Sequence, residues 1–241
     1  MGEHRSRVAT QEPFRLTERG HRRSDLYGRR AGRPLSTYQQ SLVDNLLPKI
    51  GVPAGVVDLG ALFSGARAYA FEVGFGGGEH LAAQAAAHPD IGYIGCEPFE
   101  NGVAKLLTQI DQGKLGNVRI HPDDARDVLP RLPDQSLSAF YVLFPDPWPK
   151  LRHHKRRFIQ TRTLDELSRL LKPGGELRLA TDHADYALWA LQHLMADKRF
   201  RWTATCAADW RVRPADWPAT RYEQKAIKAG RACVYLRFLR L

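Results

Sequence analysis

The sequence of 241 residues has few cysteines and no long apolar run. Its three cysteines, Cys96, Cys206 and Cys233, are odd in number and form no CxxC pair, which argues against a disulfide framework and against a structural zinc site. No stretch reaches the roughly 18 apolar residues that a membrane-spanning helix needs. The N-terminal segment also lacks the apolar core of a secretory signal. We therefore expect a soluble, cytoplasmic protein without a bound metal.

Positive charge is in excess. Lys and Arg number 36 against 26 Asp and Glu, for a net charge of +10, and such a balance favours a polyanionic partner without proving one. Residues 1–33 contain nine arginines and few aliphatic side chains, so they cannot form a core of their own. We expect a mobile, Arg-rich extension that either contacts nucleic acid or is a solvated tail. A single domain over residues 34–241 follows it.

The rest of the chain alternates between predicted strands and predicted helices. Apolar, β-branched and aromatic runs predict strands at 68–74, 92–97, 117–121, 138–144, 176–182 and 233–241. Helical spacing of apolar residues predicts helices at 34–50, 78–88, 100–110 and 184–197, and a further helix from 161 that is stopped by Pro173 and two glycines. Strands interleaved with helices of this length predict an α/β fold with a doubly wound, mostly parallel sheet.

A glycine loop, "FEVGFGGGEHL" at 71–81, joins the first predicted strand to the first helix after it. Ligands of open α/β sheets bind beyond the carboxyl ends of the strands, and Gly74 and Gly76 allow the backbone to approach a ligand closely. A dinucleotide fingerprint that starts at Gly74 requires glycine at position 79, where this sequence has Glu79. A glutamate at a helix start also disfavours a pyrophosphate, so we disfavour a nicotinamide-dependent dehydrogenase.

Carboxylates occur at three successive strand ends. Glu72 lies in the glycine loop, Glu97 ends the second predicted strand, and Asp124 follows the third. S-adenosylmethionine, a cationic cofactor with hydroxyl and amino donors, suits such acceptors. We expect Glu72 near its methionine part, Glu97 near its ribose and Asp124 near its adenine. Each acid alone could be a helix cap or a solvated turn, but the three together predict an S-adenosylmethionine site.

The stretch "YVLFPDPWPKLRHHKRRFIQ" at 141–160 places Asp146 between two prolines at the end of a strand. Proline fixes its own φ and restricts the residue before it, so this carboxylate lies in a stiff loop. Six cations follow by residue 162. A basic run is usually a solvated surface, but directly after a strand-end acid we expect it to bind RNA in a salt-dependent way. Trp148 either stacks on a flipped-out base or packs beneath the loop.

Five segments together carry a family resemblance. "FEVGFGGGEHL", "GCEPFENGV", "FPDPWPKLRHHKRR", "LRLATDHADYA" and "TRYEQKA" have the order and spacing of the bacterial tRNA (guanine-N7)-methyltransferases. The resemblance extends from about residue 33 to the C-terminus. It implies a class I methyltransferase domain with a seven-stranded, Rossmann-like sheet and helices on both faces. It also implies S-adenosyl-L-methionine as methyl donor and N7 of guanosine 46, in the variable loop of tRNA, as acceptor.

The resemblance also implies roles for individual residues. Asp146 resembles the family's catalytic residue and a cofactor contact. The other implied cofactor contacts are Glu72, Gly74, Gly76, Glu97 and Asp124. The implied substrate contacts are Lys150, Arg152, His153, His154, Lys155, Arg156, Arg157, Asp182, Thr220, Arg221, Tyr222 and Glu223. Asp182 is alternatively a cap of the helix that begins near Ala184.

Two other functions stay open at this point. A class I methyltransferase that modifies an amino group of another base also fits a proline-rich loop after the fourth strand. An RNA-binding protein that keeps the fold without activity fits the charge. The sequence does not determine an oligomeric state.

Overall fold

The structure, a computed structural model, describes residues 30–241. Seven strands of this part form one sheet in the order β3-β2-β1-β4-β5-β7-β6. The strands are β1 Ala68–Val73, β2 Ile91–Cys96, β3 Val118–His121, β4 Leu137–Leu143, β5 Leu171–Thr181, β6 Phe200–Trp202 and β7 Val234–Arg240. β1 to β5 pair in parallel, and β7 runs antiparallel to both β5 and β6. The prediction of a mostly parallel, seven-stranded sheet is confirmed.

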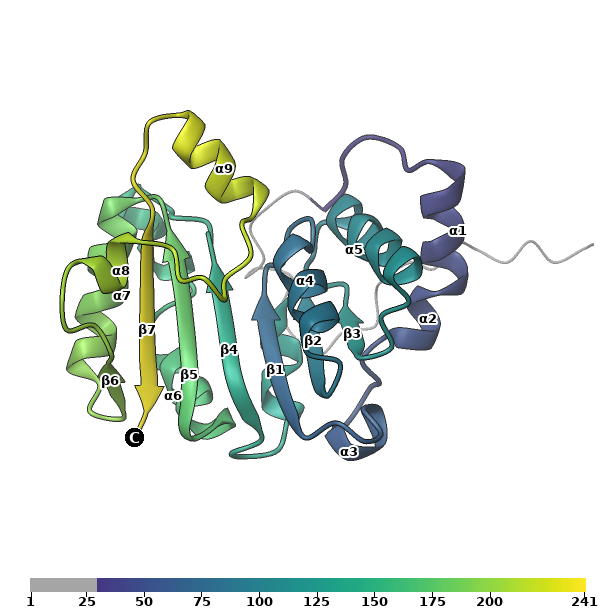
Figure 1. Ribbon diagram of the computed structural model, residues 1–241, viewed down its shortest axis with the longest axis horizontal. Helices are drawn as coiled ribbons and strands as arrows, with labels where there is room; N and C mark the ends of the chain where they lie inside the picture. The colour runs from purple at the N-terminus through teal and green to yellow at the C-terminus, as the bar shows by residue number, and fades with distance from the viewer. Residues whose placement is uncertain (1–29) are drawn as a thin grey trace, which may run out of the picture.

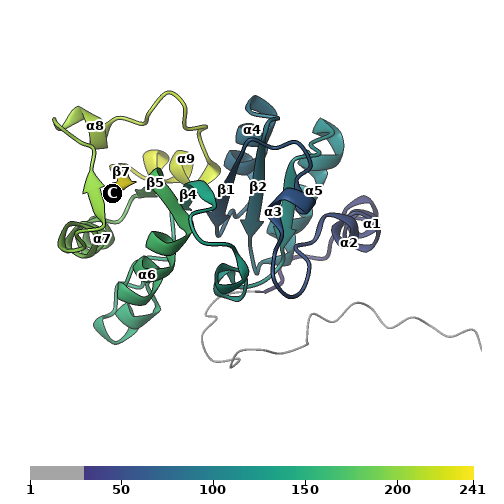
Figure 2. The ribbon, with the colours of Figure 1, turned by 90° about the horizontal axis from the view of Figure 1, so that it is seen from below.

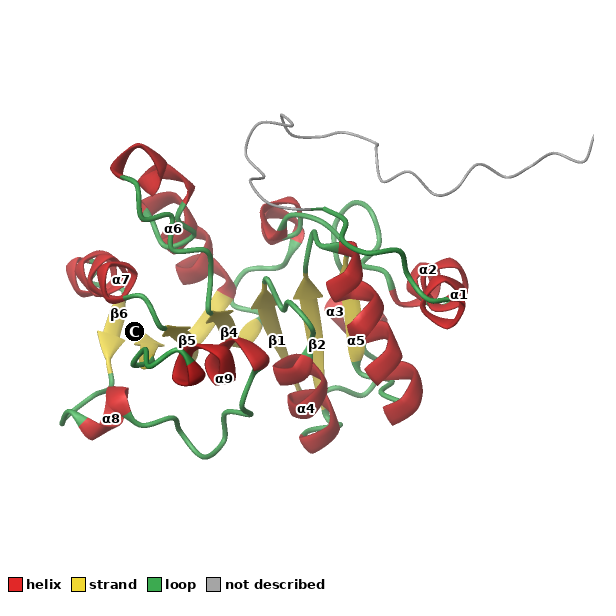
Figure 3. Ribbon diagram, turned by 90° about the horizontal axis from the view of Figure 1, so that it is seen from above, coloured by secondary structure: helices red, strands yellow, loops and turns green. Residues whose placement is uncertain are grey.

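Helices cover both faces of the sheet. They are α1 Thr37–Asn45, α2 Leu47–Ile50, α3 Leu59–Leu62, α4 Glu79–Ala87, α5 Glu100–Gly113, α6 Thr161–Leu170, α7 Ala184–Ala196, α8 Ala208–Arg211 and α9 Arg221–Lys228. Short 3-10 turns lie at η1 Ala125–Asp127, η2 Leu129–Arg131 and η3 Leu151–Arg156. Figures 1, 2 and 3 show α6 and α7 on one face and α4, α5 and α9 on the other. No helix in residues 30–241 is long and apolar enough to cross a bilayer.

The core has two apolar layers, one on each face of the sheet. Successive residues of β1 point to opposite faces. Phe71 stacks on Phe140 of β4, with ring centres 5.1 Å apart, and belongs to the layer that includes Leu164 of α6. The neighbouring Ala70 packs in the other layer, with Leu81 of α4. Because both faces are buried, the parallel strands are apolar along their length, which is why their sequences predicted them well.

Two elements differ from the prediction. The helix predicted from 161 to the stop at Pro173 is about two residues too long, because α6 ends at Leu170 and Leu171 already pairs with Leu137 in the sheet. The next residue pair of this ladder is Ala139 with Glu176, so residues 172–175 leave the ladder as an excursion within β5. The edge strand β6 was not predicted, since three residues are too few to show a strand pattern.

Residues 30–33 lie against the start of α5. The Glu100 N–H donates to the Arg30 carbonyl at 2.8 Å. The Asn101 side chain accepts from the Gly32 N–H and donates to the Arg33 carbonyl, both at 2.7 Å. These residues belong to the predicted extension and here contact α5, and the domain boundary at residue 33 stays a prediction. Residues 1–29, which make up most of the predicted extension, lie outside the described residues.

Candidate active site

A cavity of about 420 Å³ lies at the carboxyl ends of β1, β2 and β4, within the usual range for small-molecule sites. Figure 1 shows α9 beyond the ends of these strands. Seven of the predicted site residues line the cavity, namely Gly74, Gly76, Glu97, Asp124, Asp146, Arg156 and Tyr222. The predicted residues outside its lining are Glu72, Lys150, Arg152, His153, His154, Lys155, Arg157, Asp182, Thr220, Arg221 and Glu223. The chain thus brings strand-end acids and the glycine loop together, as predicted from their positions.

The glycine loop is shaped by the Glu97 carboxylate. Gly74 and Gly76 have φ of +66° and +59°, a left-handed conformation that glycine adopts without strain. Glu97 accepts a hydrogen bond from the Gly76 N–H at 2.7 Å and from the Phe99 N–H at 2.9 Å. Burial raises the pKa of Glu97, the two N–H donors oppose this shift, and the nearby Asp146 carboxylate adds to it. Each carboxylate oxygen retains acceptor capacity for a ligand.

Glu72 does not line the cavity in this structure. It lies within β1 and is buried, with one carboxylate oxygen 2.7 Å from Nδ1 of His80 in α4. The strand continues to Val73 before the chain turns. Glu72 therefore still lies in the strand, and its contact with His80 shows that its side chain points to the face that α4 covers. The predicted place of Glu72 in the loop is therefore wrong.

Asp124 lines the cavity but is already hydrogen-bonded. Its carboxylate accepts from the Arg126 backbone N–H at 3.0 Å and from Arg126 Nη2 at 2.6 Å. It thus caps η1, as the alternative in the sequence analysis allowed. The neighbouring Asp123 also lines the cavity and pairs with Arg30 at 3.2 Å. A contact between Asp124 and adenine stays a prediction.

The loop after β4 holds Asp146 between two residues in an unusual conformation. Phe144 and Trp148 have φ of +50° and +43°, a region that costs a non-glycine residue about 1 kcal/mol and that is common at functional sites. The Asp146 side chain opens to the cavity, and the loss of part of its hydration raises its pKa. Trp148 lines the same cavity, with the Arg156 guanidinium 4.9 Å from its ring centre. Stacking of Trp148 on a base stays a prediction.

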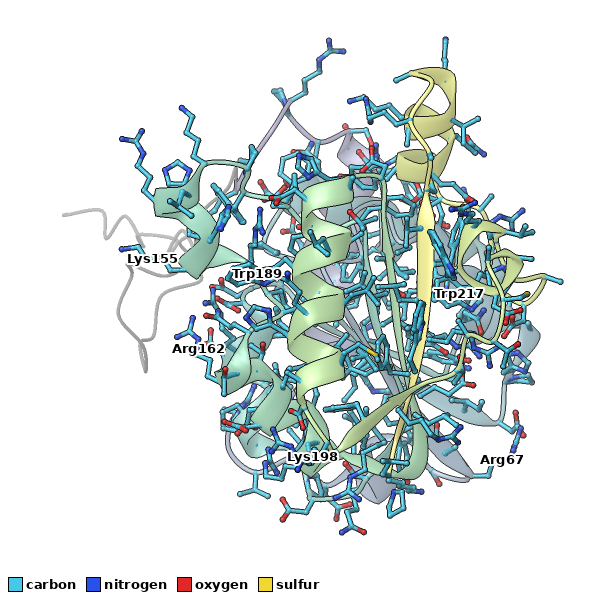
Figure 4. All side chains as sticks on the ribbon, turned by 90° about the vertical axis from the view of Figure 1, so that its left-hand side faces the viewer. Arg67, Lys155, Arg162, Trp189, Lys198 and Trp217 are labelled. Atoms are coloured by element: carbon cyan, nitrogen blue, oxygen red, sulfur yellow. The ribbon has the colours of Figure 1, made fainter. Side chains whose placement is uncertain are left out.

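The basic run after the loop forms η3 and is mostly exposed. Lys150, Arg152 and Lys155 are exposed, while His153 and His154 are partly buried against Trp148 and Trp189. Figure 4 shows Lys155 and Arg162 extending from the same side of the molecule. Within residues 30–241 no group of three His, Cys, Asp or Glu residues is arranged to hold a metal ion. These exposed cations present a surface for phosphates.

Arg157 is the exception in this run. Its side chain is fully buried and pairs with Asp185 of α7. The prediction that Arg157 contacts RNA is wrong for this structure, because no part of its side chain reaches solvent. The sequence carries no signal for this difference, since Arg156 and Arg157 are identical neighbours.

The segment "TRYE" at 220–223 contributes one residue to the cavity. Thr220 caps α9 by accepting from the Glu223 N–H at 3.2 Å. The buried Glu223 carboxylate accepts from the Tyr235 hydroxyl and pairs with Arg213 Nε at 3.0 Å. Thr220 and Glu223 therefore make internal contacts, and their roles as substrate contacts stay predictions.

The other two residues of that segment face the glycine loop. Arg221 pairs with Glu79 at 3.6 Å and lies 5.2 Å from the ring centre of Tyr222. Tyr222 lines the cavity next to Gly76. Their roles as substrate contacts stay predictions.

Asp182 lies outside the cavity lining. Its carboxylate accepts from Arg231 Nε at 2.7 Å. The cap position of α7 is His183, with no side-chain cap hydrogen bond, so the alternative of Asp182 as a helix cap is wrong.

Several lining residues were not predicted from the sequence, among them Phe99, Phe144, Gln160 and Thr163. Phe144 directly follows β4 and Phe99 lies three residues after β2, and this position near strand ends is the one signal that points to them.

Comparisons with known proteins identify the family of this chain. Residues 66–236 match a family model described as "Putative methyltransferase". A tRNA (guanine-N(7)-)-methyltransferase of Rhodospirillum rubrum is 51% identical over 221 residues, which covers 89% of this chain and 87% of that protein. One from Agrobacterium fabrum is 46% identical over 218 residues, or 89% of this chain and 94% of that protein. This chain belongs to the tRNA (guanine-N7)-methyltransferase family.

Solved structures of lower identity share the fold of this methyltransferase. The 16S rRNA methyltransferase KamB has a TM-score of 0.56 at 16% identity and covers 75% of this chain and 92% of its own. The antibiotic-resistance methyltransferase Kmr has a TM-score of 0.52 at 19% identity, with coverage of 76% and 92%. These structures support the architecture of the sheet and its helices, and they carry no further argument about the site.

Proposed function

We propose that this methyltransferase transfers a methyl group from S-adenosyl-L-methionine to N7 of the variable-loop guanosine of tRNA, position 46, by direct in-line attack of N7 on the methyl carbon. One observation carries the proposal. The loop after β4 lines the cavity through Asp146 and Trp148 and leads directly into the exposed cations of η3. A small-molecule cavity and a phosphate-binding surface thus meet at one loop.

The cavity residues fit the cofactor. Glu97 offers carboxylate oxygens at the end of β2, and Phe99 and Phe144 supply apolar walls. Carboxylates suit a cationic ligand and disfavour a pyrophosphate. When bound, S-adenosylmethionine supplies an electrophilic methyl group.

Asp146 orients the base in this proposal. N7 and O6 of guanine are acceptors, so an ionised carboxylate does not hydrogen-bond to them. It accepts instead from N1–H and the amino group on the opposite edge, which turns N7 toward the cavity. N7 already has a free in-plane lone pair, so no base has to remove a proton. Alignment and stabilisation of the positive charge that develops on the ring then account for catalysis.

Substrate binding follows from the surface around the cavity. Lys150, Arg152 and Lys155 hold tRNA phosphates. Trp148 presents an aromatic ring on which the base that enters the cavity can stack.

The test is a methylation assay. The purified protein is incubated with methyl-labelled S-adenosylmethionine and unmodified tRNA transcript, and the methyl group is located by cleavage specific for N7-methylguanosine. We expect cleavage at guanosine 46, its loss when that base is adenosine, and at least about a 100-fold lower rate for Asp146→Asn. Label on an exocyclic amino group or at another position would overturn the proposed acceptor. Cofactor binding without any transfer to tRNA would overturn the proposed substrate.

A further inference from the structure

Arg157 differs from the other cations of η3 and its flanks in its burial. Lys150, Arg152 and Lys155 are exposed and Arg156 is partly exposed, whereas the Arg157 side chain is 0% exposed. Among residues 30–241 it is the one arginine or lysine that is fully buried. A guanidinium leaves water at a high cost unless its partners compensate for the lost hydration. The contacts of Arg157 therefore indicate what it does.

These contacts join the Asp146 loop to α7. Arg157 Nε donates to the Pro147 carbonyl at 2.9 Å, and Nη2 lies 3.5 Å from the Trp148 carbonyl. Nη2 also pairs with Asp185 in the first turn of α7, and this hydrogen bond lowers the pKa of Asp185. One side chain thus binds the two carbonyls that directly follow Asp146 and anchors them to a helix.

Aromatic rings of α7 hold the guanidinium in place. Its central carbon lies 4.9 Å from the ring centre of Trp189 and 5.6 Å from that of Tyr186. Trp189 in turn donates to the Ile159 carbonyl at 2.6 Å, and Figure 4 shows Trp189 on α7 beside the η3 turn. Stacking of this kind suits the flat guanidinium of arginine and not the ammonium of lysine.

The loop has few other ways to be held. Three of the five residues at 145–149 are prolines, which have no N–H to donate. The loop must also keep Trp148 in the left-handed conformation, at φ +43°, which surrounding contacts have to maintain. The hydrogen bonds from Arg157 act at this strained position.

We propose that Arg157 is a positioning residue for methyl transfer, which holds the loop that carries Asp146 and makes no contact with RNA. This proposal rests on the proposed function, in which Asp146 orients the base. Without the tether the loop relaxes and Asp146 moves away from its productive position. A displacement of about 1 Å is enough to lower a rate about 100-fold. The change at Arg157 therefore lowers kcat, while the cations that bind phosphates stay in place.

The experiment compares Arg157→Gln and Arg157→Lys with the wild type. Steady-state kcat and KM for tRNA are measured at several salt concentrations, with Arg201→Ala, which removes an exposed arginine of β6, as the matched control. We expect Arg157→Gln to lower kcat between about 10- and 100-fold, with KM and its salt dependence within about twofold of the wild type. Arg157→Lys stays impaired, because an ammonium cannot form the same planar fork. Arg156→Gln instead flattens the salt dependence, by about one unit of slope.

A double variant tests whether Arg157 acts through Asp146. If it does, Arg157→Gln lowers the rate of Asp146→Asn by less than about twofold, because the two changes remove one effect. Independent, multiplicative losses would overturn the proposal, as would a normal kcat in folded Arg157→Gln or a flattened salt dependence in that variant. If Arg157→Gln does not fold, Asp185→Asn, which loosens the anchor at a half-exposed residue, serves the same comparison.

The proposed function and the proposed role of Arg157 are tested by different measurements. The site that the wild type methylates tests the proposed function, whereas the ratio of variant to wild-type rate tests Arg157. That ratio can be measured with any RNA that the wild type methylates.

Discussion

Tyr222 lies directly against Gly76. A Cβ placed on Gly76 would be 2.7 Å from Cε2 of the Tyr222 ring, although 146 residues separate the two in sequence. This contact joins the first turn of α9 to the glycine loop at one side of the cavity. It also makes the glycine necessary for two reasons, its left-handed φ and the space that the ring occupies.

Gly76→Ala should therefore weaken cofactor binding. The methyl group forces the Tyr222 ring away and strains the backbone by about 1 to 2 kcal/mol. We expect about 10-fold weaker binding of S-adenosylhomocysteine by calorimetry. Gly116→Ala is the matched control, since a Cβ there meets no atom within 4 Å. Equal affinity in both variants would show that the Tyr222 contact does not shape the site.

Asp146→Asn should make the protein more stable at neutral and higher pH while it abolishes most activity. The pKa of Asp146 is raised in the folded state. The folded protein therefore binds more protons than the unfolded chain between the two pKa values, and stability falls as pH rises through that interval. The variant lacks this loss, so its melting temperature should exceed that of the wild type at about pH 7.5, and the difference should shrink toward about pH 4. A variant that melts no higher than the wild type at pH near neutral would contradict the desolvation of Asp146.

Lys155→Gln should flatten the salt dependence of tRNA binding. Each phosphate contact that is lost removes about one counterion from the slope of log Kd against log salt. Lys198→Gln is the matched control, because Lys198 is also exposed but lies at the opposite end of the molecule (Figure 4). The measurement is fluorescence anisotropy between about 50 and 200 mM salt. The same slope for both variants would place the RNA elsewhere.

Glu223→Ala should destabilise the fold. It leaves the buried Tyr235 hydroxyl and the Arg213 guanidinium without their common acceptor, at a cost of about 2 to 3 kcal/mol. Tyr235→Phe removes one of these groups with its hydrogen bond and should cost about 1 kcal/mol. Urea unfolding measures both. A loss below about 1 kcal/mol for Glu223→Ala would favour the direct substrate contact that the sequence suggested.

Local sequence patterns determined the order of the strands and helices and the position of the cavity. Apolar runs predicted β1 to β5, because parallel strands are buried on both faces, and alternation predicted the antiparallel β7. Glu97 and Asp146 could be placed together from sequence alone, since the carboxyl ends of parallel strands meet at one edge of the sheet. Both rules depend on the spacing of apolar residues and on the direction of the strands, which can be read from the sequence.

Tertiary structure alone decided which polar groups are buried. Arg156 and Arg157 are the same residue type one position apart, yet one lines the cavity and the other lies beneath the loop. Glu223 looked like a substrate contact and is an internal acceptor for Tyr235. The burial of a charge depends on partners such as Asp185 and Tyr235 that only the folded chain brings within hydrogen-bonding distance, and no local pattern in the sequence specifies them.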